Sequence, residues 1–197
     1  MVLYFMSGCL IKNKQLLLYL PYDPVIMTLN QLNYRKASIE DKAQLKALGL
    51  LSYGQYQSVL APEYYAQLHA NLQNDEKLEE LIGTSTCFVC EDQGQIVGMA
   101  YLIPHGNPWD IFKAEWSYIR MVGVNPAYQG WGIAKALTKH CIDFAKETGE
   151  QTIALHTSEF MHAARHIYEG LGFKVVQEIP QRLGKRYWLY VLDLDQA

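Results

Sequence analysis

The chain has 197 residues, of which half are hydrophobic and 19% are charged. These proportions are ordinary for a globular protein, and the length fits one domain with a sizeable core. The 17 basic and 20 acidic residues give a formal net charge of −3, which argues against a nucleic-acid surface as the main function.

The cysteines and histidines show no pattern that predicts a metal site. Four cysteines are too few for a disulfide scaffold, so a cytoplasmic location is expected. Cys87 and Cys90 lack a second Cys or His pair at zinc spacing, and on a strand they would point to opposite faces. His162 and His166 are four residues apart, but the glutamate of the metalloprotease motif is missing between them. We therefore expect no metal.

The first 26 residues differ in pattern from the rest of the chain. Their apolar runs, residues 3–6 and 16–20, are separated by polar residues and are too short to span a membrane. The basic start and the small-residue cleavage site of a signal peptide are missing. We expect residues 1–26 to be an extension of unclear role, residues 27–197 to form the one domain, and no association with a membrane.

The first half of this domain predicts a strand, two helices and a hairpin. Ser38 suits the N-cap of the first helix, and Pro62 suits the first turn of the second, which ends at Gly83. A turn at residues 91–94 joins two strands. The predicted elements are a strand at 32–37, helices at 38–48 and 63–81, and strands at 87–90 and 95–103.

The second half predicts strands that alternate with helices. Gly149 suits the end of a central helix that begins at about residue 133. Arg182, Lys185 and Arg186 are expected on the loop between the two closing strands. The other predicted elements are a strand at 115–124, a strand at 152–157, a helix at 161–170, and strands at 174–178 and 187–194.

The junction before the central helix has the pattern of an anion-binding turn. Apolar residues 121–124 end a strand, Pro126 breaks it, and Gly130 and Gly132 lead directly into the helix. The first-turn N–H groups of a helix have no intrahelical partners, and the helix dipole adds positive charge there. The two glycines let an anion approach the backbone closely. This stretch therefore predicts a phosphate cradle.

Two well-known phosphate cradles do not fit the stretch. A Walker A loop needs Lys-Ser/Thr after its last glycine, but Gly132 is followed by Ile133 and Ala134. A dinucleotide fingerprint needs Gly or Ala where this chain has Lys135. A nucleotide-phosphate enzyme is therefore disfavoured.

The stretch resembles the acetyl-CoA motif of the GNAT superfamily of N-acetyltransferases. The motif reads here as Gln129-x-x-Gly132-x-Ala134, preceded by the Val-x-Pro of residues 124–126. A second GNAT hallmark, Ala-x-x-x-Tyr-x-x-x-Gly-Phe, matches residues 164–173 and places a tyrosine at Tyr168. Together the resemblances cover roughly residues 30–194 in element order.

The resemblance implies an α/β (α+β) fold with a mixed, mostly antiparallel sheet that is flanked by helices and splayed between its fourth and fifth strands. Acetyl-CoA would bind there as co-substrate. Loop amides would hold its pyrophosphate, and the backbone of residues 121–124 would pair with its pantetheine arm. The residues expected at the cofactor are Met121, Val122, Val124, Gln129, Gly130, Trp131, Gly132, Ile133, Ala134, Lys135 and Thr138.

The resemblance also implies direct attack of an amine on the thioester in a ternary complex. Tyr168 inherits the role of protonating the departing thiolate, and packing of the same side chain is the alternative. Glu115 and Tyr118 are candidates for the amine side of the reaction, near the splayed strands, with His156 and Glu159 close by. No motif singles out one of them as the general base. Met161 stands where many members have an asparagine that contacts pantetheine, so this contact is not expected here.

The acceptor is expected to be a primary amine of a small molecule or a peptide, and not a nucleic acid. Tyr53, Tyr56, Tyr64 and Tyr65 cluster where the GNAT fold places its acceptor site, but packing of two helices would explain them equally well. A non-catalytic acyl-CoA-binding module is the alternative function. The oligomeric state stays open, with a homodimer among the alternatives.

Overall fold

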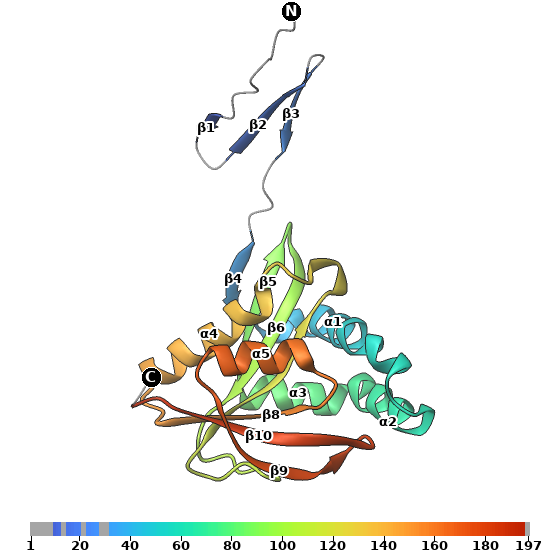
Figure 1. Ribbon diagram of the computed structural model, residues 1–197, viewed down its shortest axis with the longest axis vertical. Coiled ribbons are helices and arrows are strands. Elements are labelled where there is room, and N and C mark those ends of the chain that lie inside the picture. The colour runs from blue at the N-terminus through green and yellow to red at the C-terminus, as the bar shows by residue number, and fades with distance from the viewer. Residues whose placement is uncertain (1–9, 13–14, 21–22, 28–31, 196–197) are drawn as a thin grey trace, which may run out of the picture.

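The computed structural model describes residues 10–12, 15–20, 23–27 and 32–195 (Figure 1). These residues form two separate sheets. The first contains β1 (Leu10–Lys12), β2 (Gln15–Leu20) and β3 (Asp23–Met27), paired antiparallel in that order. This small sheet ends at Met27, one residue after the expected end of the extension, and the assignment of residues 1–26 as an extension stays a prediction.

The second sheet has seven strands in the order β4-β5-β6-β7-β8-β10-β9. All neighbours are antiparallel except β7 and β8, which are parallel, so the prediction of a mixed and mostly antiparallel sheet is confirmed. The strands are β4 (Asn33–Lys36), β5 (Thr86–Asp92), β6 (Gln95–Ile103), β7 (Ser117–Val124), β8 (Thr152–Ser158), β9 (Lys174–Arg182) and β10 (Lys185–Asp193).

Successive side chains of a strand point to opposite faces of the sheet, and here the side chains on both faces are apolar. Helices therefore cover both faces. Buried side chains of α4 and α5 share one core cluster with the strands, and those of α1 and α3 share the other (Figure 1). The helices are η1 (Ile39–Asp41), α1 (Lys42–Gly54), η2 (Gln55–Ser58), α2 (Pro62–Gln73), α3 (Asp75–Thr84), η3 (Pro126–Tyr128), α4 (Ile133–Glu147) and α5 (His162–Gly170). Within the described part of the chain, none of them is both long and apolar enough to cross a membrane.

An ion-pair cluster joins the first strand of this sheet to the helix that follows. Both guanidinium NH2 groups of Arg35 donate to the Asp41 carboxylate, at 2.7 and 2.8 Å, and one also donates to Glu91 at 2.6 Å. The Arg35 hydrogen bonds lower the pKa of Asp41 to about 2. The Asp41 carboxylate also accepts the Ser38 N–H at 2.8 Å, as expected of a helix start at Ser38.

The structure corrects two sequence predictions. The helix expected at 63–81 is two helices, because Asn74 leaves the helical conformation and its side chain caps α3 by accepting the Lys77 N–H at 2.9 Å. Arg182, Lys185 and Arg186 lie on strands β9 and β10 instead of on a loop. Both residues of the turn between these strands, 183 and 184, have positive φ, which matches a tight hairpin.

Cys87 and Cys90 lie on opposite faces of β5, as predicted. Each belongs to a different core cluster, and both are buried free thiols, as is Cys141. Cys9 lies outside the described residues. The cysteines described by the structure therefore act as core side chains.

A close contact between β6 and α4 generates a stability prediction. A Cβ added at Gly98 would lie 2.5 Å from Cγ2 of Ile133 and 3.0 Å from Cδ1 of Leu137, whereas a Cβ at Gly83 in α3 would meet nothing within 4 Å. We expect Gly98→Ala to lower the free energy of unfolding by about 1–3 kcal/mol through overpacking. Gly83→Ala should raise it by roughly 0.5–1 kcal/mol. Urea unfolding measures both, and an unchanged stability in Gly98→Ala would contradict the close packing of α4.

Candidate functional site

Strands β7 and β8 part soon after they meet. Their parallel ladder has two residue pairs, Ser117 with Ile153 and Tyr118 with Ala154, although both strands continue beyond it. The sheet is therefore splayed between the fourth and fifth of its seven strands, as predicted. A cleft of about 1100 Å³ lies at this opening and is lined by residues of both strands and of helices α1, α2, α3 and α5.

A β-bulge in β7 shapes the floor of this cleft. Met99 pairs with Gly123 and Tyr101 with Arg120, so β7 takes one more residue than β6 between the same two points. Met121, inside the bulge, has φ of 51°, which is uncommon for a residue with a side chain. Tyr118 and Met121 pack with one core cluster, whereas Ile119 and Val122 pack with the other, so the extra residue places Met121 on the face of Tyr118 and Arg120. Arg120 and Met121 therefore line the cleft side by side.

The glycine turn lies where β7 runs through η3 into α4. Gly130 and Gly132 have φ of 84° and 78°, and a Cβ added at either would meet no heavy atom within 4 Å. The hydrogen bond from the Ala136 N–H to the Gly132 carbonyl, at 3.0 Å, begins the helical series. The backbone N–H groups of residues 132–135 precede it and lie at the positive end of the helix. The turn therefore offers open space beside free donors, which suits a phosphate group.

The other predicted cofactor residues have different surroundings. Met121 and Val122 line the cleft, and Val124 packs partly buried against the core. The Gln129 side chain donates to Gln55 at 3.1 Å, and Trp131 is largely exposed. Ile133, Ala134 and Lys135 form the first turn of α4, and the Ile133 side chain is buried, so it offers its backbone alone. Thr138 is buried and its hydroxyl donates to the Ala134 carbonyl at 2.8 Å, inside the helix.

Two of the three predicted catalytic residues line the cleft. Tyr168 on α5 is buried, and this burial raises its pKa, so the phenol keeps its proton at neutral pH. Tyr118 is stacked on Phe112 with the ring centroids 4.2 Å apart, and its hydroxyl donates to the Asn107 carbonyl at 3.1 Å. Glu115 instead lies exposed in the loop before β7, 3.8 Å from the Lys113 ammonium.

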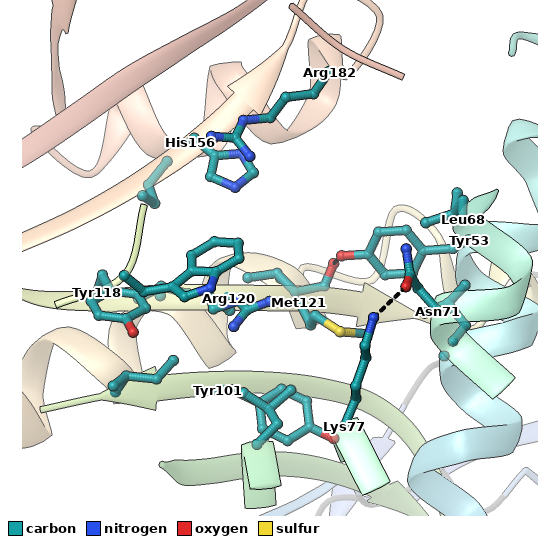
Figure 2. Close-up of a pocket in the computed structure, with 18 of the residues that line it drawn as sticks. Tyr53, Leu68, Asn71, Lys77, Tyr101, Tyr118, Arg120, Met121, His156 and Arg182 are labelled. Atoms are coloured by element: carbon teal, nitrogen blue, oxygen red, sulfur yellow. Dashed lines mark hydrogen bonds between the residues drawn. The ribbon is translucent and has the colours of Figure 1, made fainter. Parts of the chain in front are cut away.

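Among the residues of the cleft, Asn71, Lys77 and Arg120 were not singled out by the sequence. Figure 2 shows Arg120 and Met121 together on β7, His156 and Arg182 on the opposite wall, and Lys77 donating to Asn71, at 2.6 Å. Burial lowers the pKa of the Arg120 guanidinium and that of His156, the latter to about 4. One signal could have identified Arg120, since it is the single charged residue in the strand 117–124.

The tyrosine cluster divides between the cleft and the helix surface. Tyr53, Tyr56 and Tyr64 line the cleft, and the Tyr53 hydroxyl donates to the Val122 carbonyl at 3.4 Å. Tyr65 packs against His69 on the same helix, with ring centroids 5.9 Å apart. The expectation of an aromatic acceptor pocket therefore applies to three of the four tyrosines. Over the residues that the structure describes, no three His, Cys, Asp or Glu side chains gather as a metal site would need.

Comparison with known proteins identifies relatives for much of the chain. The sequence profile of the Acetyltransferase (GNAT) family matches residues 53–173. N-acetyltransferase 8B of Mus musculus is 35% identical over 89 residues, which are 45% of this chain and 38% of the relative. N-acetyltransferase family 8 member 3 of the same species is 29% identical over 114 residues, 57% of this chain and 46% of the relative. The chain thus matches less than half of the length of either relative.

Solved structures share the fold at low identity. The PaiA N-acetyltransferase of Thermoplasma acidophilum, crystallised with coenzyme A, is 19% identical with a TM-score of 0.65, covering 80% of this chain and 97% of the other. The ribosomal-protein-alanine N-acetyltransferase of Brucella melitensis is 19% identical with a TM-score of 0.64, covering 82% and 99%. At such identities the likeness shows the fold.

The buried imidazole of His156 generates a pH prediction. Its Nδ1 is buried without a hydrogen-bond partner in the described structure, and burial lowers its pKa from 6.5 to about 4. Between pH 6.5 and 4, His156 binds a proton in the unfolded chain but not in the folded one. The free energy of unfolding should therefore fall by at most roughly 3 kcal/mol as the pH falls through this range. His156→Gln should flatten this part of the profile of unfolding free energy against pH.

Asp41→Asn is the matched control for this pH window. The pKa of Asp41 is lowered from 3.8 to about 2, so its contribution is complete above pH 3.8 and is lost below it. Asp41→Asn should therefore keep the slope between pH 6.5 and 4. If the unfolding free energy of His156→Gln depends on pH between 6.5 and 4 as steeply as that of the wild type, His156 is protonated in the folded state at these pH values.

Proposed function

Because the chain belongs to the Acetyltransferase (GNAT) family, we propose that it transfers an acetyl group from acetyl-CoA to a primary amine in the cleft between β7 and β8. The observation that carries the proposal is the parting of these strands beside the glycine turn of α4. The parted strands make room for an extended chain, and the turn supplies donors for a phosphate group.

The residues present fit acetyl-CoA. The first-turn amides of residues 132–135 would hold the pyrophosphate, because Gly130 and Gly132 leave the space beside them open. Beyond Tyr118, the edge of β7 that faces β8 leaves its ladder, so backbone groups around Val122 can pair with the amides of the pantetheine arm. We propose no side-chain contact of Thr138 with acetyl-CoA, because its buried hydroxyl donates to the Ala134 carbonyl within α4.

When bound, acetyl-CoA supplies an acetyl thioester, whose carbonyl carbon forms a bond to the amine nitrogen as its bond to sulfur breaks. Tyr168 donates its phenolic proton to the departing sulfur, which leaves as a thiol. The phenol regains a proton from solvent, and the nitrogen loses one to solvent, so the protons balance. The raised pKa of Tyr168 keeps it in the donor form at neutral pH.

Tyr168→Phe tests the proton donor. It removes the hydroxyl and keeps the ring that packs 5.9 Å from Phe173, so the fold should survive. An acid catalyst contributes on the order of 10²–10⁴ in rate, so kcat should fall by such a factor while the Kd for acetyl-CoA changes little. Thiol release from acetyl-CoA over a panel of amines measures the rate, and calorimetry measures the Kd.

Tyr34→Phe on the edge strand β4 controls for the loss of a phenolic hydroxyl outside the cleft. Full activity in Tyr168→Phe would mean that another group protonates the sulfur. If the wild-type protein binds acetyl-CoA but releases no thiol with any amine, the chain is a non-catalytic acyl-CoA-binding module.

Gly132→Asp and Gly132→Asn test the phosphate cradle as a matched pair. Both residues tolerate the left-handed φ of this position better than other side chains, and they differ mainly in charge. Both should weaken acetyl-CoA binding by filling the open space. The aspartate variant should bind on the order of tenfold more weakly than the asparagine variant, because its charge repels the pyrophosphate. Wild-type affinity in a folded Gly132→Asp protein, measured by calorimetry, would contradict the cradle.

A further inference from the structure

Arg120 is a cation in the cleft with no anion to neutralise it. Its side chain is half-buried, and across the described residues no carboxylate lies within ion-pair distance of it. Two of the other three cationic side chains of the cleft have such partners, since Arg182 pairs with Asp110 and Lys46 with Asp75. The third, Lys77, is exposed and donates to the neutral amide oxygen of Asn71 at 2.6 Å. A partly desolvated charge without a partner is costly, so it is usually kept where a ligand supplies the opposite charge.

The surroundings of Arg120 orient its guanidinium for such a ligand. Arg120 lines the cleft on the same face of β7 as Tyr118, two residues before it, and the bulge adds Met121 beside it. The guanidinium carbon of Arg120 lies 4.0 Å from the centre of the Trp109 ring. A guanidinium stacked on an aromatic ring by its face keeps its N–H donors at the edge, where they can bind a carboxylate through two parallel hydrogen bonds. Figure 2 shows Arg120 in the middle of the cleft, near Met121.

The charge of the cleft points the same way. The charged side chains that line it are Lys46, Lys77, Arg120, Arg182 and Glu80. Glu80 acts on Arg120 through space without forming an ion pair with it. Asp75 and Asp110 neutralise Lys46 and Arg182, so Lys77 and Arg120 remain against Glu80. This remaining excess of one cation disfavours a polyamine and favours an acceptor with an anionic group. Leu68, Leu72 and Tyr64 add an apolar wall on α2 that suits a hydrophobic side chain.

Building on the proposed acetyl transfer, we propose that the acceptor is a free amino acid, whose carboxylate Arg120 binds while its amine faces the thioester. The N-terminus of a peptide lacks this carboxylate beside its amine. A simple amine lacks it altogether. The carboxylate is therefore the feature by which the cleft would tell its substrate from other amines.

Matched acceptors test this substrate class. Each of a panel of amino acids is compared with its amide, which resembles a peptide N-terminus, and with its decarboxylated amine, by thiol release from acetyl-CoA. For the preferred amino acid we expect a kcat/KM at least tenfold above that of the other two. Equal or faster reaction of the amide or the decarboxylated amine would overturn the proposal. Faster reaction of phosphoethanolamine than of β-alanine would assign the anion as a phosphate and would also overturn it.

Variants assign the preference to Arg120. Arg120→Gln should lower kcat/KM for the amino acid on the order of 10- to 100-fold, mainly through KM, and leave the amide unaffected. Arg120→Lys keeps the charge without the two-pronged geometry and should restore part of the loss. Arg186→Gln removes an exposed arginine that pairs with Glu178 at 2.7 Å and should behave like the wild type. If Arg120→Gln lowers kcat/KM equally for the amino acid and for its amide, Arg120 has a structural role and the proposal is overturned.

Binding without acetyl-CoA separates this inference from the proposed function. Calorimetry compares an N-acetyl amino acid with its N-acetyl amide, using N-acetylphenylalanine as the probe. The wild type should bind the acid at least tenfold more tightly than the amide, and Arg120→Gln should bind both alike. Equal binding in the wild type would overturn the carboxylate site even if amines are acetylated. Absence of thiol release with every amine would instead overturn the acetyl transfer, and the binding comparison would still decide the role of Arg120.

Discussion

Strands β7 and β8 can share only a short ladder, and the site depends on this limit. β8 pairs with β7 at residues 117 and 118 and with β10 along its whole length, so the last three strands lean away from the first four as one unit. The helices α4 and α5 cover one face of the sheet on the two sides of the gap. Through this single opening β7 presents its backbone, α5 presents Tyr168, and β9 presents Arg182.

Burial sets the protonation states in the cleft more than direct charge pairing does. It raises the pKa of Tyr168 and lowers those of His156 and Arg120, so each group is pushed toward its neutral form. A low-polarity cleft also strengthens any hydrogen bond or charge interaction that forms inside it. The contrast with Arg35, whose two carboxylate partners raise its pKa, shows how differently the chain treats a structural arginine.

Motifs and periodicity could predict the order of the strands and helices and the glycine turn, because both follow from local chemistry. Glycine in a left-handed conformation before a helix is visible in residues 130–132, and so is the hairpin of β5 and β6. The bulge at Met121 was missed because a register shift between strands depends on tertiary packing. The break at Asn74 has a local signal, an N-cap residue followed by two acidic residues, which the continuous helical pattern of 63–81 obscured. Arg120 carries a visible signal, the single charge in an apolar strand, but its neighbour Trp109 comes from the loop before β7 and is revealed only by the fold.

The two sides of the cleft differ in how strongly they depend on side-chain identity, and this difference bears on how family members diverge. In the proposed site, the cofactor side of the cleft relies on the glycine turn and the parted edge of β7, which many sequences can supply. The proposed acceptor side depends on the identity of individual residues, such as Trp109, Arg120 and Tyr64. Under this proposal, mutations on the acceptor side would change which amine is chosen and leave the binding of acetyl-CoA intact. Such a division lets paralogous copies acquire new acceptors by few substitutions, while structures at 19% identity keep the same fold.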